Sequence, residues 1–344
     1  MSGSARPDNS LAGAKSSRYS HPMTISGFTL VRNGVKFDYP FMESIQSLFA
    51  FCDEVIINVG ISEDDTLQRI EAWKASLSQK DASRVTIFTS EWPLNDPAKR
   101  QGGQILAEQT NLALKRCKGD WCLYLQADEV LHEKDYDIIR KDIEGIDPVH
   151  GVDALIFQYV HFYCGYGVIQ TSRSSYRREI RAIRNWKGIW SVGDAQSFRY
   201  ITGDKIAGVL TDARIFHYGW VRPPEVMKAK TGFMDTLYHA GATADQPATG
   251  DNYKYKRFVG LKPFRGTHPA VMQLRVEART QEGGFDLKSA PWVFERKDLW
   301  KILSSFIEVT TGIRPFEFKN YRLMSWGDVR ARSKSVARVL KRTT

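Results

Sequence analysis

Short apolar runs alternate with helical patterns between residues 25 and 121. Strands are predicted at 25–31, 54–59 and 84–89. Between them, apolar residues recur three and four positions apart, which is typical of helices that bury one face. Strands that alternate with helices in this way predict an α/β domain with a mainly parallel sheet.

A further run, Trp121–Leu125, is almost wholly apolar and predicts a strand buried on both faces. It is followed directly by Gln126-Ala127-Asp128-Glu129. In open parallel sheets, ligands bind beyond the carboxyl ends of the strands. We therefore expect Asp128 and Glu129 to face one crevice together with Asp64 and Asp65, which follow the second strand.

The pattern changes after residue 151. Longer β-like runs such as 154–162 carry many aromatic residues and arginines, which predicts a mixed sheet in the second half. Residues 241–256 are polar and rich in Gly and Asp, which indicates a loop, and 298–309 carry a helical apolar stripe.

These changes predict the organisation of the chain. We expect a flexible polar leader at 1–21, an α/β domain at 22–240, and a loop with a helical, basic C-terminal extension at 241–344.

The net charge of the chain indicates which kinds of partner it is expected to bind. The 49 Lys and Arg against 39 Asp and Glu give a net charge of +10, which favours anionic partners such as nucleotides, phosphates, nucleic acid or an acidic membrane. No helix-turn-helix spacing or RNA-binding aromatic motif is present, so no nucleic-acid partner is expected. The basic residues of 325–344 indicate either a segment that docks on anionic lipid or a solvated tail.

Two further features bear on location. No apolar run reaches the 18 or so residues that a bilayer span needs. The four cysteines show no paired CxxC spacing, so neither a disulfide framework nor a zinc ribbon is indicated. We expect a cytoplasmic protein, with peripheral contact at the inner face of the membrane if the basic tail docks there.

The cluster after Trp121–Leu125 has the residue types of a divalent-cation site. Hard cations prefer oxygen ligands, and they bind nucleotide diphosphates through one or two carboxylates. The same acids would also serve as caps of a following helix, and the cluster alone does not separate these alternatives.

Four motifs occur in an order that resembles a known family. They are a strand ending in Arg32-Asn33, a strand leading to Ser62-x-Asp64-x-Thr66, a helix from Gly102 through Asn111-x-Ala113, and Gly119-Asp120-Trp121 leading through a strand to Ala127-Asp128-Glu129. With this order, residues 25–133 resemble the nucleotide-binding half of the family 2 glycosyltransferases, which have the GT-A fold. The resemblance implies a Rossmann-like, mixed and mainly parallel sheet flanked by helices, with a donor half at 22–133 and an acceptor half at 134–240.

The resemblance implies a metal site at the end of the fourth strand. In the family this strand ends in Asp-x-Asp, and Asp128 stands at the second aspartate, the direct ligand of Mg²⁺ or Mn²⁺. Gln126 replaces the first aspartate, and its amide adds no negative charge. His217, at the end of a predicted strand, is either a second metal or diphosphate ligand, as the resemblance implies, or a core histidine.

The resemblance also implies donor contacts from Arg32, Asn33, Asp64, Gln126 and Ala127. An aspartate that the family carries before the acidic turn is Val59 here. Asn58 or Asp65 would replace its contact with the base or ribose, while Asp64 serves equally well as a helix cap.

In the second half, Arg181-x-x-Arg184-Asn185-x-x-Gly188-x-Trp190 and Gly193-Asp194 resemble the acceptor side of bacterial lipopolysaccharide glycosyltransferases. An inverting transfer needs a base near the acceptor hydroxyl, and Asp194 is the candidate, with Glu129 and Asp212 as substitutes. The alternative is that Gly193-Asp194 only forms a turn. Arg181 and Arg184 either bind ligand phosphates or form a solvated face. Trp190 either stacks on a sugar or belongs to the core.

The resemblance implies an inverting, metal-assisted glycosyltransferase that moves a sugar from a nucleotide-diphosphate donor to a saccharide or lipid-linked acceptor in bacterial surface-glycan synthesis. Two alternatives stay open at this level. One is a sugar nucleotidyltransferase, although Arg32-Asn33-Gly34 lacks the glycine-rich character of a phosphate loop. The other is a non-catalytic glycan- or nucleotide-binding protein of the same fold.

Overall fold

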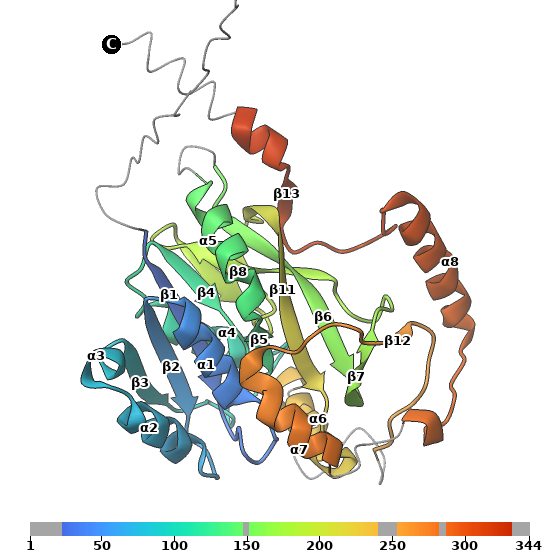
Figure 1. Cartoon of the computed structure of the whole chain (residues 1–344), viewed down its shortest axis with the longest axis horizontal. Coiled ribbons are helices and arrows are strands. Elements are labelled where there is room, and N and C mark those ends of the chain that lie inside the picture. The colour runs from blue at the N-terminus through green and yellow to red at the C-terminus, as the bar shows by residue number, and fades with distance from the viewer. Residues whose placement is uncertain (1–22, 147–150, 240–252, 282–286, 332–344) are drawn as a thin grey trace, which may run out of the picture.

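The computed structural model describes residues 23–146, 151–239, 253–281 and 287–331. The predicted leader at 1–21, most of the predicted loop at 241–256 and residues 332–344 of the basic tail lie outside these ranges. In the first half, apolar runs form strands and the segments between them form helices (Figure 1). In order they are β1 (Ile25–Val31), α1 (Phe41–Phe51), β2 (Glu54–Gly60), α2 (Thr66–Ser76), α3 (Gln79–Ala82), β3 (Val85–Ser90), α4 (Gln104–Leu114) and β4 (Trp121–Tyr124).

The second half is richer in strands. In order its elements are β5 (Glu129–Leu131), α5 (Tyr136–Glu144), β6 (Ala154–Tyr163), β7 (Gly165–Gln170), β8 (Arg178–Arg184), β9 (Ile189–Val192), β10 (Ser197–Tyr200), β11 (Ala207–Trp220), α6 (Pro224–Tyr238), β12 (Leu261–Pro263), α7 (Gln273–Gln281), α8 (Arg296–Thr311) and β13 (Arg322–Met324).

Most strands join one large sheet. Its main path runs β12-β7-β6-β8-β4-β1-β2-β3. Strands β3, β2, β1 and β4 pair in parallel, whereas β8 runs antiparallel between β4 and β6. The long strand β11 pairs in parallel with β6. The prediction of an α/β fold with a mixed, mainly parallel sheet flanked by helices and a helical C-terminal extension is confirmed.

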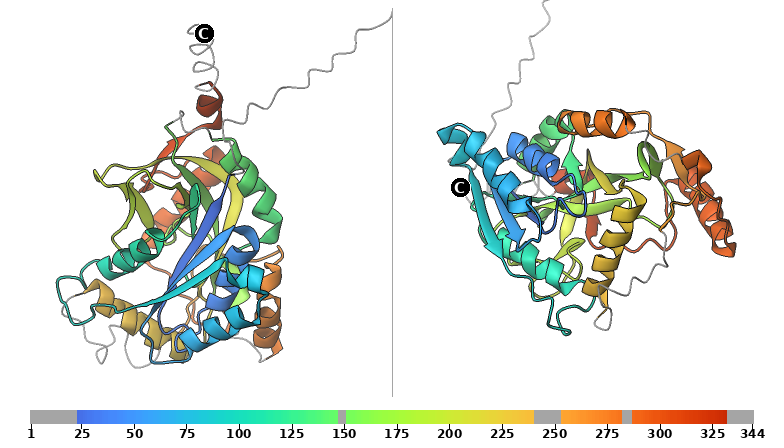
Figure 2. Two further views of the ribbon diagram at one scale, coloured as in Figure 1. Left: turned by 90° about the vertical axis from the view of Figure 1, so that its left-hand side faces the viewer. Right: turned by 90° about the horizontal axis from the view of Figure 1, so that it is seen from below.

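Alternate side chains of the central strands enter two cores. Val55, Ile57 and Val59 of β2 pack with α1 and α5, whereas Ile56 packs on the other face with α4 and the end of α6. Figure 2 shows these helices on the two sides of the sheet. Burial on both faces accounts for the continuous apolar runs in the sequence.

The segment after residue 252 adds strands as well as helices. Strand β12 pairs with β7, and β13 pairs with β11. The predicted boundary at residue 240 falls outside the described ranges, and the division of the chain there stays a prediction. Within the described ranges, no helix combines the length and the hydropathy that crossing a bilayer requires.

Candidate active site

A cavity of about 840 Å³ lies where β1 and β4 end and β8 begins. This volume is in the range of small-molecule sites. Six arginine and lysine side chains line it against four carboxylates, and this surplus suits an anionic ligand. Among the residues predicted from the sequence, the lining includes Arg32, Gln126, Ala127, Asp128, Asp194 and His217.

Asp128 lies at the floor of the cavity among basic side chains. Lys230 Nζ donates to Asp128 Oδ2 at 3.1 Å, and Arg222 Nη2 lies 3.5 Å from the same oxygen. Burial alone would raise the pKa of Asp128, but the positive charges of Lys230 and Arg222 bring it well below its ordinary value. Asp128 is therefore ionised, and only its second oxygen, Oδ1, faces His217, at 3.7 Å from Nε2.

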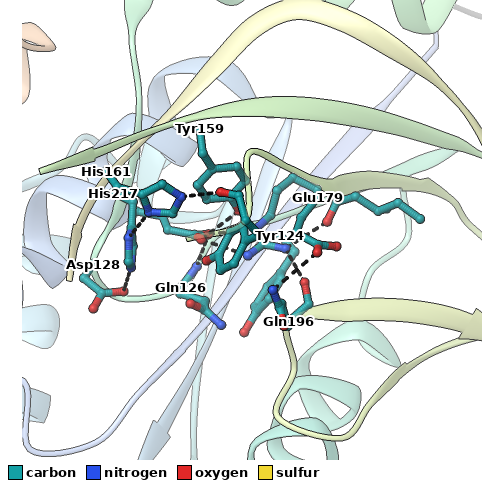
Figure 3. Close-up of polar contacts among 12 residues, drawn as sticks. Tyr124, Gln126, Asp128, Tyr159, His161, Glu179, Gln196 and His217 are labelled. Atoms are coloured by element: carbon teal, nitrogen blue, oxygen red, sulfur yellow. Dashed lines mark hydrogen bonds and ion pairs between the residues drawn. The ribbon is translucent and has the colours of Figure 1, made fainter. Parts of the chain in front are cut away.

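The protonation of His217 follows from a chain of hydrogen bonds that Figure 3 shows. His161 Nε2 lies 2.6 Å from the carbonyl oxygen of Tyr176, which only accepts, so Nε2 carries a hydrogen. Burial lowers the pKa of His161 to about 3, so this ring is neutral and its Nδ1 has a lone pair. That nitrogen lies 2.8 Å from His217 Nδ1, which must donate.

Burial also lowers the pKa of His217, so this second ring is neutral as well. With its hydrogen on Nδ1, His217 directs a bare Nε2 toward Asp128. The contact between the two histidines is set by the sheet, because residues 161 and 217 are register partners in the β6–β11 ladder.

The side chains of Asp128 and His217 are suited to supply two of the ligands of a divalent cation. Asp128 Oδ1 and His217 Nε2 are both acceptors. The neighbouring Gly219 leaves their surroundings open, since a Cβ there would lie 2.5 Å from Nε2. No group of three or more His, Cys, Asp or Glu side chains with metal-binding geometry occurs among the described residues. Two protein ligands match a cation whose other positions are filled by substrate phosphates and water.

Glu129, next to Asp128, has a structural role. Arg181 Nε and Nη2 each donate to it at 2.8 Å, and both side chains are fully buried. Tyr159 Oη donates to Glu129 Oε1 and the Gln126 backbone to Oε2. These bonds hold the strand exit, with Gln126 and Asp128, against β8, and they leave Glu129 with no exposed surface from which to act as a base.

Asp194 lies in the turn between β9 and β10 and faces the same cavity. Its Oδ2 accepts from Tyr238 Oη at 3.1 Å, and its Oδ1 from the Gln196 backbone at 3.2 Å. The start of α4 approaches it closely at Gly103, which has a φ of 73°. A Cβ at Gly103 would lie 2.8 Å from Asp194 Cβ, so this contact requires glycine.

Glu179, on β8, is a second carboxylate of the cavity wall, and it was not predicted. Burial raises its pKa to about 7. Its Oε1 accepts from Asn320 at 3.0 Å and from Gln196 at 3.3 Å, while its buried Oε2 makes no hydrogen bond within the described part of the chain.

The other predicted site residues have partners away from the cavity lining. Asn58 Nδ2 binds Gln109, and Asp64 accepts from Thr66 and from the Lys36 backbone. Asn33 accepts from the Glu63 backbone. For these three, the role in donor binding stays a prediction.

Two predicted acceptor-side residues also lie outside the lining. Arg184 pairs with Asp153 at 3.4 Å and stacks on Trp121, at the end of β8 remote from the cavity. Lys115 Nζ lies over the Trp190 ring, 5.0 Å from the ring centroid. Ligand contacts by these two residues stay predictions.

The sequence missed two residues of the cavity lining, Lys230 and Tyr39, and it missed His161, which lies behind His217. Lys230 Nζ lies 5.1 Å from the Tyr39 ring centroid, and burial lowers its pKa to about 8. Nothing local marks Lys230, which is 102 residues from Asp128. His161 had one signal, as a histidine inside the apolar strand run 154–162.

No model of a protein family matches this chain, and no curated protein matches it. Similar solved structures include S. aureus TarS 1-349, 16% identical over 62% of this chain and 65% of that chain, with a TM-score of 0.34. The same protein in complex with UDP is 20% identical over 41% of this chain and 36% of that chain, with a TM-score of 0.27.

A third similar structure is the mannosyltransferase PcManGT from Pyrobaculum calidifontis in complex with GDP-Man and Mn²⁺. It is 17% identical over 42% of this chain and 37% of that chain, with a TM-score of 0.30. The chain thus covers between about a third and two thirds of the length of these proteins. The function of this protein is therefore inferred from the residues of its own cavity.

Proposed function

We propose that this protein is a glycosyltransferase that moves a sugar from a nucleotide-diphosphate donor to a hydroxyl group of a saccharide acceptor. One observation carries the proposal. A single cavity at the carboxyl ends of the parallel strands contains both the Asp128, His217 and Lys230 cluster and the carboxylate of Asp194. The cluster suits the binding of a diphosphate, and the Asp194 carboxylate suits the acceptance of a proton from an attacking hydroxyl.

The donor diphosphate would bind over the Asp128 cluster. Lys230 Nζ uses two donor positions, on Asp128 and on the Gly219 carbonyl, and its third is available to a phosphate oxygen. Arg32, held by the Ile61 carbonyl, lines the same cavity and adds a second positive charge. Together they would stabilise the charge that develops on the departing diphosphate.

Asp128 and His217 would hold Mg²⁺ or Mn²⁺ beside the diphosphate. When bound, the cation would neutralise charge on the leaving group as a Lewis acid. His161 keeps the His217 lone pair on Nε2, and the Asp128 carboxylate stays ionised among its basic neighbours.

Asp194 would accept the proton of the acceptor hydroxyl. The hydroxyl oxygen forms a bond to the anomeric carbon as the bond from that carbon to the diphosphate oxygen breaks, and the electron pair leaves with the diphosphate. Attack from the side opposite the leaving group inverts the anomeric configuration. Tyr238 and the Gln196 backbone orient the Asp194 carboxylate for this step.

For the acceptor, we propose a saccharide or lipid-linked glycan of a bacterial surface polymer, as the family 2 resemblance in the sequence implies. The protein would work at the cytoplasmic face of the membrane. The basic segment 325–344, for which the sequence leaves lipid docking and a solvated tail open, lies mostly beyond residue 331, outside the described ranges.

Two measurements test the proposal. Calorimetry with UDP, GDP, CDP and dTDP, with Mn²⁺ or EDTA, is expected to show binding of one nucleotide, weakened by Asp128→Asn. With the matching nucleotide sugar, Asp194→Asn is expected to lower kcat for sugar transfer by roughly 10²- to 10⁴-fold with little change in nucleotide affinity.

The outcomes separate the alternatives. Release of pyrophosphate from a nucleoside triphosphate and a sugar phosphate would instead identify a nucleotidyltransferase. If Glu179→Gln abolishes transfer and Asp194→Asn does not, Glu179 is the base. Failure to bind any of the four nucleotides would remove the donor site.

A further inference from the structure

Helix α8 is attached to the rest of the protein through its polar side. Glu308 pairs with Arg177 at 3.0 Å and with Arg314 at 2.7 Å. Arg173 donates to Ser304 Oγ, and Ser304 itself is buried. The side of α8 that faces the protein is therefore the polar one.

The opposite side of α8 is apolar and exposed. Leu299, Ile302, Leu303 and Phe306 recur three and four positions apart and so form one stripe, with Trp300 beside it. We call these five residues the α8 apolar face. Their exposed fractions are 60%, 43%, 48%, 66% and, for Trp300, 73%.

This polarity is the reverse of a packed surface helix, which buries its apolar stripe and exposes its charges. Figures 1 and 2 show α8 at the periphery of the molecule, so its outer side is not turned toward another element of the described part of the chain. In the segments on either side of α8, Trp292, Phe294 and Ile313 are also exposed. An exposed apolar stripe along a whole helix is typical of an interaction site.

The charged residues of α8 indicate what kind of surface the α8 apolar face binds. Within α8, Asp298 is buried and Glu308 is paired inward, so no described carboxylate of the helix lies on its outer side. The exposed acid next to the helix is Glu295, at its N-cap. The helix itself carries Arg296, which is exposed. The whole chain has a net charge of +10.

Leucine and aromatic side chains flanked by basic residues are typical of helices that lie in the plane of a bilayer interface, and anionic headgroups attract the basic residues. We propose that the α8 apolar face lies on a membrane surface that contains anionic lipid. This surface is separate from the active-site cavity, and the proposal does not depend on the reaction performed there.

Co-sedimentation with vesicles tests the proposal on the full chain. The vesicles are phosphatidylcholine alone, or phosphatidylcholine with one quarter phosphatidylglycerol. The variant Trp300→Ser with Phe306→Ser removes two exposed side chains of the face. The matched control, Trp186→Ser with Ile201→Ser, removes two that are 77% and 75% exposed elsewhere.

We expect the wild type and the control to bind the anionic vesicles equally, and the α8 variant to bind at least tenfold more weakly. Wild-type binding should also fall in 0.5 M NaCl or with phosphatidylcholine alone. Circular dichroism and nucleotide binding verify that the variants are folded.

Three results would overturn the proposal. The first is wild-type protein that stays in the supernatant with anionic vesicles. The second is an α8 variant that binds as well as the wild type, which would assign any attachment to another segment. The third is a lipid-free dimer, seen by sedimentation velocity, that the α8 variant dissociates, because the face would then join two copies of this chain.

Discussion

At the scale of single residues, the free lone pair of His217 depends on the direction of two successive hydrogen bonds. The Tyr176 carbonyl accepts from His161, His161 accepts from His217, and His217 is left with a bare nitrogen toward Asp128. His161 touches neither a substrate nor the proposed metal position. It is a positioning residue, and its effect passes through His217.

Two nearly isosteric substitutions separate this role from simple packing. His161→Asn keeps an acceptor close to the position of Nδ1, and His161→Leu removes it. We expect Mn²⁺ affinity, measured by electron paramagnetic resonance, to fall roughly 10- to 100-fold in the Leu variant and much less in the Asn variant. Equal affinities would show that the hydrogen bond does not matter, while nucleotide binding in EDTA tests the donor site independently.

Glu179 gives a second prediction, on stability. Its pKa rises from 4.5 to about 7 on folding because of burial, so the native state holds a proton that the unfolded state has lost between these pH values. The free energy of unfolding of the wild type should therefore fall as the pH rises through this window.

Replacing Glu179 with Gln removes the titration and keeps an acceptor for Asn320. We expect Glu179→Gln to unfold at higher urea than the wild type at pH 8, by a free energy on the order of 3 kcal/mol, and to differ little at pH 4.5. A variant less stable than the wild type at pH 8 would mean that Glu179 is ionised at low cost.

At the scale of elements, the start of α4 and the β9–β10 turn fit together. The Gly102 and Gly103 amides donate to carbonyls at the end of α6, at 3.2 and 3.0 Å. This ties α4, α6 and the Asp194 turn into one wall of the cavity. Both glycines have positive φ, but only Gly103 has a neighbour within reach of a Cβ.

The two glycines form a matched pair for a test. Gly102→Ala and Gly103→Ala should each cost roughly 1 to 2 kcal/mol of stability because of the left-handed backbone. Only Gly103→Ala should also displace Asp194, and we expect it to lower kcat at least tenfold further than Gly102→Ala does. Equal kcat values in a transfer assay would show that the position of Asp194 tolerates this shift.

At the scale of the whole molecule, the C-terminal segment closes one side of the cavity. Arg314, Glu317 and Asn320 line it, and Arg177 pairs with Glu317 at 2.6 Å. This arrangement joins a segment near the end of the chain to β8, although the two are about 140 residues apart.

Removing the charge of Arg177 tests this closure. Arg177→Met should lower the local opening free energy of residues 304–320 by about 1 to 2 kcal/mol, since its ion pairs are partly exposed. Hydrogen exchange should become faster there and stay unchanged in β1 and β2. Uniform protection across the chain would mean that other contacts hold this segment.

The sequence predicted what local pattern determines. The parallel strands were predicted because burial on both faces gives continuous apolar runs, and Asp128 was predicted to lie at a strand end because it follows such a run. The apolar stripe of α8 predicted a helix, but periodicity does not reveal what covers the stripe. Lys230 and His161 were missed, because their places depend on pairing between distant segments.

The buried pair of Arg181 and Glu129 constrains how this sequence can change over time. Loss of either partner strands the other charge in the core, which typically costs 3 to 5 kcal/mol, whereas joint replacement by apolar residues of similar volume is often neutral. Single substitutions at 129 or 181 should therefore vanish from a mutated population selected for folding. Variants that still fold would need both residues to change together, so positions 129 and 181 should vary as a pair or not at all.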